Sequence, residues 1–142
     1  MINICSVKKN DYSILRAIES SLFEKSTIIN GLQNITGNIS VKIWKLVTTE
    51  IIGYVYFYHV KDEVEIINIG ILKQHQHKGY GSIIIKEIKK LKLKKIFLEV
   101  SAENTHAINF YIKNGFKKIG RRKAYYKGNN KRIDALRLLF EF

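Results

Sequence analysis

The spacing of apolar residues along the chain changes between a period of two, typical of strands, and a period of three to four, typical of helices. Tight turns at 48–50 and 61–62 are expected to join neighbouring strands into an antiparallel meander. The elements expected in this half are a strand at 2–7, a helix at 11–22, a short helix from Ser26 to about 34–37, and strands at 39–47, 51–60 and 63–72.

The helix expected at 11–22 shows the helical period clearly. Asn10 or Asp11 is expected to cap its N-terminus, because either side chain can accept a backbone N–H of the first turn. Its buried face is expected to comprise Ile14, Leu15, Ile18 and Leu22.

In the second half of the chain, the residue pattern predicts a strand–helix–strand unit followed by a helix and a β-hairpin. Its elements are a helix from Gly79 with Ile84, Ile88 and Leu91 on one face, a strand at 95–101, a helix at 104–113 capped by Asn104 and ended by Asn114 and Gly115, and strands at 116–126 and 132–141 around a turn at 127–130. The crossover makes strands 63–72 and 95–101 parallel and linked right-handedly. The predicted fold is α/β (α+β), with a mixed central sheet of about seven strands and helices on both faces.

Composition limits the class of protein. The 142 residues include no proline and no Gly/Ser-rich stretch, so residues 1–142 are expected to form a single domain without a linker. Cys5 is the only cysteine, which excludes an intrachain disulfide and Cys-rich zinc sites. Apolar runs fall short of the roughly 20 residues of a membrane span, and the start lacks the order of a signal peptide. We expect a soluble, cytoplasmic protein with no membrane partner.

The charge is strongly basic, with 25 Lys and Arg against 12 Asp and Glu, a formal net charge of +13. Such a charge attracts nucleic acid or phosphorylated ligands. The lysines are spread along the chain without interleaved aromatics, however, so an AT-rich genome is the simpler explanation. A weak contact with RNA or a ribosome through the basic surface stays open, and the oligomeric state is not indicated.

Gly79 and Gly81 lie at a strand-to-helix turn and form the first candidate site. The first N–H groups of a helix lack partners and carry partial positive charge, which suits a phosphate, and Lys78 adds a full charge. A purely structural turn is the alternative. The segment is neither a Walker loop nor a dinucleotide fingerprint.

Glu99 lies late in the strand expected at 95–101 and is the second candidate. Alternation would place Glu99 on the face opposite Ile96, Leu98 and Val100. It is either a general base in a partly desolvated position or a half-exposed carboxylate paired with a lysine. Tyr111, on the next helix, suits a core or a catalytic role. The histidines, His59, His75, His77 and His106, show no metal-ligand spacing, so no metal is expected.

These features occur in the order found in a known family. The segment 63–134 resembles the GNAT N-acetyltransferases, whose motif Q/R-x-x-G-x-G/A appears here as Gln76-His77-Lys78-Gly79-Tyr80-Gly81. The runs INIGI, IFLEVSAENTHAINFYIKNGFKKIGRRKAYY and IDAL resemble, more narrowly, the RimI-type ribosomal-protein alanine N-acetyltransferases. The resemblance covers about half of the chain closely.

The resemblance implies the GNAT fold, whose middle parallel strands splay, and acetyl-CoA as co-substrate. Glu99 would be the proton acceptor and Tyr111 the proton donor. The cofactor would be bound by Ile69, Gly70 and Ile71 through backbone groups, by His77, Lys78, Gly79, Tyr80, Gly81 and Ser82 around the pyrophosphate, and by Asn104. The implied acceptor is a protein N-terminus, the alanine of small-subunit ribosomal protein eighteen.

Some positions depart from the family pattern. Gly70 replaces a common alanine and Leu72-Lys73 replaces Asp-Pro, from which we expect altered loop stiffness. Ile133 replaces an acidic residue, which makes the acceptor less certain than the cofactor. Two alternatives stay open: an acetyltransferase of a lysine, polyamine or other small amine, and a basic RNA-binding module built on a degenerate acetyltransferase fold.

Overall fold

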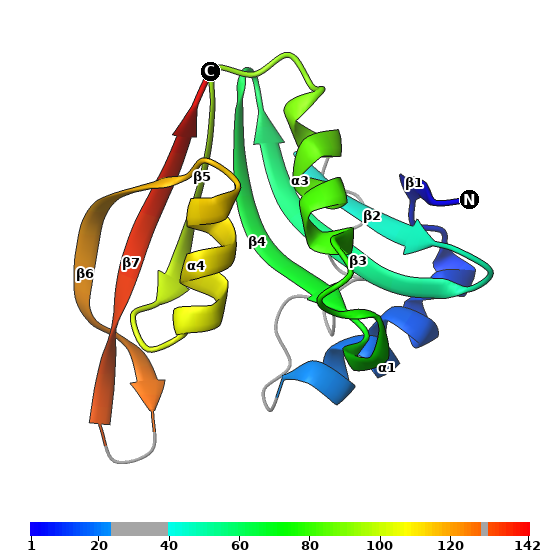
Figure 1. Ribbon diagram of the computed structural model, residues 1–142, viewed down its shortest axis with the longest axis horizontal. Coiled ribbons are helices and arrows are strands. Elements are labelled where there is room, and N and C mark those ends of the chain that lie inside the picture. The colour runs from blue at the N-terminus through cyan, green and yellow to red at the C-terminus, as the bar shows by residue number, and fades with distance from the viewer. Residues whose placement is uncertain (24–39, 129–130) are drawn as a thin grey trace. The chain divides into compact units, whose positions relative to one another are not determined.

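The structure is a computed structural model that describes residues 1–23, 40–128 and 131–142, with the side chains of 127 and 128 left aside (Figure 1). The short helix expected from Ser26 and part of the turn at 127–130 lie outside the described residues. The strands are β1 (Asn3–Ser6), β2 (Val41–Val47), β3 (Ile51–Val60), β4 (Glu63–Ile71), β5 (Lys95–Ser101), β6 (Lys117–Gly128) and β7 (Lys131–Glu141). The helices are α1 (Tyr12–Leu22), α3 (Tyr80–Lys89) and α4 (Thr105–Lys113), with 3₁₀ turns η1 (Lys9–Asp11) and η3 (Lys73–His75).

Within the described ranges the strands form a seven-stranded sheet in the order β1-β2-β3-β4-β5-β7-β6. The chain divides into two compact units, Met1–Val60 with Ile66–Leu91 and Lys61–Glu65 with Lys92–Phe142. β4 belongs to both units, because its first three residues lie in the second. The predicted α+β class, with about seven strands in a mixed sheet, is confirmed.

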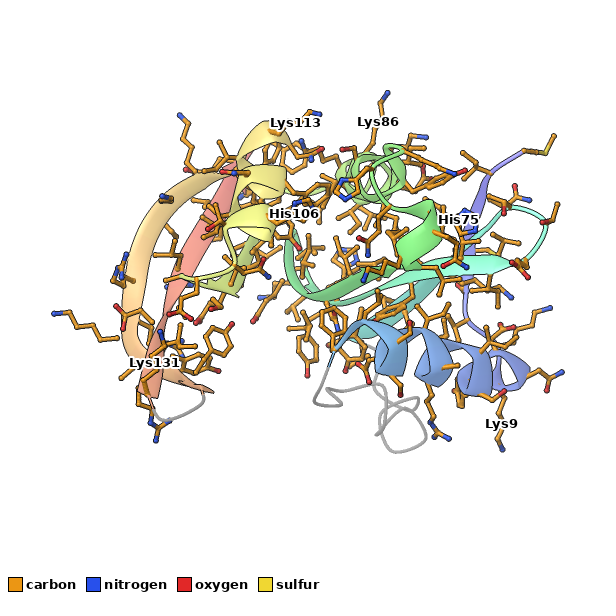
Figure 2. All side chains as sticks on the ribbon, turned by 60° about the horizontal axis from the view of Figure 1, so that its bottom comes forward. Lys9, His75, Lys86, His106, Lys113 and Lys131 are labelled. Carbon is orange, nitrogen blue, oxygen red and sulfur yellow. The ribbon has the colours of Figure 1, made fainter. Side chains whose placement is uncertain are left out.

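The first unit contains the antiparallel meander. β1 pairs with β2 and β2 with β3 in antiparallel register, and a two-residue turn leads from β3 into β4. α1 and α3 lie on opposite faces of these strands (Figure 2). Leu15 and Ile18 of α1 pack against Tyr54 of β3, and all three are buried.

Two expectations for α1 are corrected. Ile14 does not lie on the buried face, since 46% of it is exposed. Asp11 is the N-cap residue, but its side chain caps no helix N–H. Its carboxylate accepts instead from the Lys8 N–H at 2.8 Å and from Lys45 Nζ at 2.7 Å, and these bonds lower its pKa. The fixed partner of Asp11 is therefore a strand lysine 34 residues away.

The second unit contains β5, β7 and β6, paired antiparallel, with α4. The starts of β4 and β5 also lie side by side here. The Lys94 N–H donates to the Asp62 carbonyl at 2.7 Å, and Lys95 pairs with Glu63 at 3.7 Å. Two strands that begin together run in the same direction, which confirms the predicted parallel pair.

The local details of this unit follow the sequence. Ile96, Leu98 and Val100 are buried on one face of β5, as alternation predicted. The Asn104 side chain caps α4 by accepting the Ala107 N–H at 3.2 Å. Gly115, with φ of 94°, follows the helix end in the left-handed region that favours glycine. The sequence thus sets the start and end of α4.

No helix in the described ranges has both the length and the apolar character required to cross a membrane. Nor, over the same ranges, do three or more His, Cys, Asp or Glu side chains gather where they could hold a metal ion.

Candidate active site

The turn before α3 leaves its helix N-terminus open. Gly79 is the N-cap residue with φ of 87°, and no side chain caps the helix. The first bond of the helix runs from the Ile83 N–H to the Gly79 carbonyl at 3.1 Å, so the helix offers no partner to the N–H groups of Tyr80, Gly81 and Ser82. These groups and the helix dipole suit an anion.

The open space at this turn fits a phosphate. A Cβ built on Gly79 would meet nothing within 4 Å, so no part of the described chain fills the position. His77 also has a positive φ of 62°, which turns successive N–H groups toward one side of the loop. Lys78 is exposed and contributes positive charge. The residues expected to surround the pyrophosphate, 77–82, therefore fit that group.

The end of β4 supplies the other expected cofactor residues of the first unit. Ile69 and Ile71 are half-buried and Gly70 is buried. Gln76 Nε2 donates to the Ile71 carbonyl at 2.8 Å, which fastens the loop after the strand to the strand itself. A Cβ on Gly70 would lie 2.5 Å from Cε1 of the buried Tyr54. Close packing against Tyr54 thus explains why residue 70 is glycine. The sequence showed only that Gly70 replaces an alanine common in the family.

In the second unit Glu99 lies among other charged groups. Its Oε1 accepts from Arg122 Nη2 at 2.7 Å, and its side chain is 19% exposed. Its Oε2 is buried and has no hydrogen-bond partner among the described residues. The partner is an arginine rather than the lysine that the sequence suggested. A buried carboxylate oxygen without a donor is costly, so this atom is suited to receive an N–H from a ligand.

The neighbours of Glu99 come from three other strands. Burial and the Glu99 charge raise the pKa of Glu65 on β4, which Arg137 and Arg122 partly offset. Arg137 lies directly opposite Glu99 in the β5–β7 register. Burial, followed by the Glu99 charge, raises the pKa of Tyr126 on β6. Glu99 therefore lies in a mixed cluster of two carboxylates, two guanidinium groups and a phenol.

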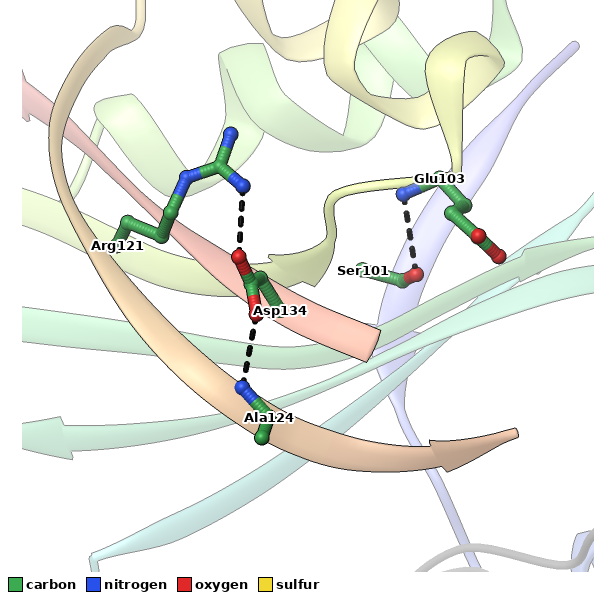
Figure 3. A network of polar contacts seen from close by, with 5 residues as sticks. All are labelled: Ser101, Glu103, Arg121, Ala124 and Asp134. Atoms are coloured by element: carbon green, nitrogen blue, oxygen red, sulfur yellow. Dashed lines mark hydrogen bonds and ion pairs between the residues drawn. The ribbon is translucent and has the colours of Figure 1, made fainter. Parts of the chain in front are cut away.

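An irregularity in β6 directly follows Arg122. Arg122 is opposite Ala135 and Tyr126 opposite Ile133, so four steps on β6 match two on β7. Ala124 lies in the extra segment with φ of 54°. Asp134 of β7 stabilises this conformation: its Oδ1 accepts the Ala124 N–H and its Oδ2 accepts Arg121 Nη1, each at 2.8 Å (Figure 3).

Tyr111 lies on α4 in an aromatic cluster. It is 9% exposed and packs edge-to-face on Phe110 and Phe116, with ring centroids 5.0 and 5.4 Å away. Burial raises its pKa, which keeps the phenol protonated and able to donate. Asn104, the other expected residue here, uses its carbonyl oxygen as the helix cap, which leaves its amide nitrogen for a ligand.

The structure groups the expected residues by unit. Residues 69–71 and 77–82 belong to the first, and Glu99, Asn104 and Tyr111 to the second. Sequence reasoning missed Glu65, Arg122, Tyr126 and Arg137. The motif RR-x-x-YY contains two of them, and period-two alternation from Glu63 places Glu65 on a strand, but the strand register was needed to bring them to Glu99.

The fold and these features are those of an acyltransferase class. Residues 21–116 match the family described as Acetyltransferase (GNAT) family, and the chain belongs to that family. It is a GNAT N-acetyltransferase, and the enzymes of the family are acyltransferases that use acetyl-CoA. The predicted family, with its fold and enzyme class, is confirmed.

The chain is also similar in sequence to two N-acetyltransferases with named acceptors. The chain is 28% identical over 127 residues to the [Ribosomal protein bS18]-alanine N-acetyltransferase of Haemophilus influenzae, covering 87% of this chain and 86% of that protein. It is 24% identical over 100 residues to the spermidine N(1)-acetyltransferase of Thermoplasma acidophilum, covering 67% of this chain and 62% of that protein.

Solved structures share the fold. The ribosomal-protein-S18-alanine N-acetyltransferase from Escherichia coli matches with a TM-score of 0.87 and 24% identity, covering 99% of this chain and 94% of that chain. Arabidopsis thaliana NAA60 in complex with acetyl-CoA matches with a TM-score of 0.84 and 18% identity, covering 100% and 99%. These likenesses show the fold.

Proposed function

We propose that the protein transfers the acetyl group of acetyl-CoA to a protein α-amino group, the N-terminal alanine of small-subunit ribosomal protein eighteen. The observation that carries this proposal is the Glu99 carboxylate, with one oxygen held by Arg122 and the other buried without a donor. The 28% identity to a bS18-alanine acetyltransferase supports the choice of acceptor.

The proposed reaction is a direct attack. Glu99 takes a proton from the acceptor ammonium, and the free nitrogen attacks the thioester carbonyl carbon. An α-amine, with a pKa near 8, needs less help from a base than a lysine near 10.4. The C–S bond of the tetrahedral intermediate then breaks, and Tyr111 gives its proton to the departing thiolate. The nitrogen then loses its second proton to solvent, and Tyr111 regains a proton from solvent. The products are the neutral amide, coenzyme A and a protonated Glu99.

The cofactor residues have separate roles in this proposal. Backbone groups of Ile69, Gly70 and Ile71 bind the pantetheine arm and the thioester carbonyl. The N–H groups of 80–82, with His77, Lys78 and Gly79, bind the pyrophosphate, and the Asn104 amide donates to the cofactor. The open N-terminus of α3 and the vacant Cβ position of Gly79 support the pyrophosphate assignment.

The reaction itself is tested with a panel of acceptors. Acetyl-CoA is expected to raise the Tm of the protein, because a ligand that binds only the native state stabilises it. Mass spectrometry would then compare an Ala-starting peptide, the same peptide with a blocked N-terminus and an internal lysine, and spermidine. We expect acetyl transfer to the free alanine. Transfer to spermidine or lysine alone would replace the proposed acceptor.

The base and acid are tested by isosteric variants. Glu99→Gln should lower kcat by ~10²–10⁴-fold, the range for a lost general base, with KM for acetyl-CoA nearly unchanged. Tyr111→Phe should also lower kcat, since it keeps the ring packing and removes the proton donor. Glu103→Gln is the control, because Glu103 is an exposed carboxylate paired with Lys131. Normal turnover in both site variants would contradict the assigned roles.

A polyamine acceptor is the second candidate. It is favoured by the Glu65 and Glu99 pair, which would attract a cation, and by the spermidine N(1)-acetyltransferase relative. Arg122 and Arg137 beside these carboxylates offset that attraction. For the first candidate, we propose a cytoplasmic enzyme that consists of one domain and needs no metal. It would acetylate the ribosomal protein either free or at the ribosome. Acetyl transfer by the wild type would exclude a module that only binds RNA.

A further inference from the structure

We infer that Arg122 is a positioning residue, which holds Glu99 Oε1 so that Glu99 Oε2 is left to take the proton of the acceptor amine. The inference rests on the proposed function of Glu99. It assigns a role to a residue that does not itself touch the reacting atoms.

Arg122 and Glu99 are joined by a single hydrogen bond, to one of the two carboxylate oxygens. Arg122 Nη2 donates to Oε1 at 2.7 Å, while Oε2 is buried and lacks a partner among the described residues. A guanidinium bound to both oxygens would place its positive charge and an N–H donor against each of them, which would make both oxygens poorer proton acceptors. The observed contact fixes the carboxylate and still leaves one oxygen available.

A role in stability explains this pair poorly. The Arg122 side chain is 51% exposed, and exposed ion pairs contribute little to folding stability. The Glu99 side chain, at 19% exposure, is more buried than the acidic side chains of the other ion pairs of this unit, which are 28% to 52% exposed: Asp62, Glu63, Glu103 and Asp134. Arg122 thus neutralises a carboxylate that is partly withdrawn from water.

Arg122 is itself fixed by contacts independent of Glu99. Its guanidinium carbon lies 4.4 Å from the centroid of the Tyr125 ring, within the range of a cation–π contact. It also begins the irregular segment of β6, in which the Ala124 N–H donates to Asp134 Oδ1 at 2.8 Å. The Tyr125 ring therefore holds the guanidinium, and a hydrogen bond of the backbone two residues further on fixes the strand that carries it, before any substrate binds.

Arg122 offsets the repulsion between two neighbouring carboxylates, those of Glu65 and Glu99. Glu65 faces Glu99 from β4, Arg137 lies opposite from β7, and Tyr126 lies on β6. Without Arg122, the repulsion between Glu65 and Glu99 would be opposed by Arg137 alone. Glu99 would then be expected to occupy more than one rotamer, since no other described residue donates a hydrogen bond to its Oε1.

The test compares two adjacent arginines. Arg122→Gln removes the Glu99 contact. Arg121→Gln removes an ion pair with Asp134, and its arginine lies on the same strand and is equally exposed. We expect Arg122→Gln to lower kcat by ~10–100-fold, the scale for a displaced catalytic group, with KM for acetyl-CoA unchanged. Arg122→Lys should recover part of the loss because it restores the charge without the planar fork. Arg121→Gln should keep kcat within about twofold of wild type. Unchanged kcat in Arg122→Gln, or an equal loss in Arg121→Gln, would overturn the inference.

A second measurement does not depend on activity. Crystal structures of Arg122→Gln and Arg121→Gln should show Glu99 in several rotamers in the first and in one rotamer in the second. A single, unmoved Glu99 in Arg122→Gln would overturn the positioning role even if no acceptor were found. A wild type that acetylates no amine would overturn the proposed function alone, so the two failures are distinguishable.

Discussion

At the scale of single residues, Gly70 shows how one packing contact decides a side chain. Its Cβ position lies 2.5, 2.7 and 2.9 Å from three atoms of Tyr54, whose ring is fully buried. Flexible side chains could yield at such distances, but a phenol ring inside a core cannot move without displacing its neighbours. Residue 70 is therefore glycine because residue 54 is tyrosine.

Gly70→Ala is expected to lower the free energy of unfolding by ~1–3 kcal/mol, the usual cost of overpacking a core. Urea denaturation measures it. Gly120→Ala is the control, since its nearest neighbour, Arg137 Cδ, would be 4.0 Å away. In a Tyr54→Leu background the cost should shrink, because the clashing ring is gone. Equal, small effects of both glycine substitutions would contradict this explanation.

The chemistry of single residues was only partly predictable. Alternation along 95–101 correctly placed Glu99 opposite the buried face of β5. It could not supply Arg122 as the partner, because that contact depends on the pairing of β5 with β7 and of β7 with β6. Nothing in the run Lys123-Ala124-Tyr125 signals a left-handed residue, since alanine rarely adopts a positive φ. The Asp134 carboxylate, remote in sequence, stabilises that conformation.

At the scale of elements, the β6–β7 pair depends on an ionised side chain. The Ala124 N–H bond and then the Arg121 guanidinium lower the pKa of Asp134 below its ordinary value of 3.8. A carboxyl with a depressed folded pKa stabilises the fold above its unfolded pKa, and this contribution is lost as the pH falls through the folded value.

Asp134→Asn should therefore lower the urea midpoint at pH 7, and the difference from wild type should shrink as the pH falls below 3.8, the ordinary pKa of an aspartate. Asparagine keeps an oxygen for the Ala124 N–H and loses the charge that Arg121 needs. Asp62→Asn, which breaks the exposed 3.5 Å pair with Lys94, is the control and should change little at either pH. A difference that persists unchanged at low pH would rule out ionisation as its cause.

The elements themselves were predicted well where the signal was local. The Asn104 cap, the glycine after α4 and the alternation of β5 each require only neighbouring residues. The prediction of the buried face of α1 was partly wrong. Ile14 precedes Leu15 by one residue, which is about 100° around the helix, so its side chain turns toward solvent. The partner of Asp11 was also missed, because Lys45 comes to it from β2 only in the folded chain.

At the scale of the whole molecule, the net charge of +13 predicts binding to polyanions without sequence preference. Affinity for a single-stranded RNA oligomer should fall steeply between about 50 and 200 mM salt, whether or not acetyl-CoA is present. If the charge is compositional, glutamate at Lys117 and Lys118 should weaken binding as much as glutamate at Lys8 and Lys9. All four residues are exposed. A loss confined to the first pair would instead identify β6 as a dedicated RNA surface.

The exposed thiol of Cys5 on β1 has a practical consequence for every rate measured on this enzyme. Colourimetric detection of released coenzyme A uses reagents that react with any accessible sulfhydryl. One equivalent per polypeptide will therefore appear as a burst before turnover begins. Alkylating that single atom beforehand removes the background, and the same reaction can attach one fluorophore at a known place.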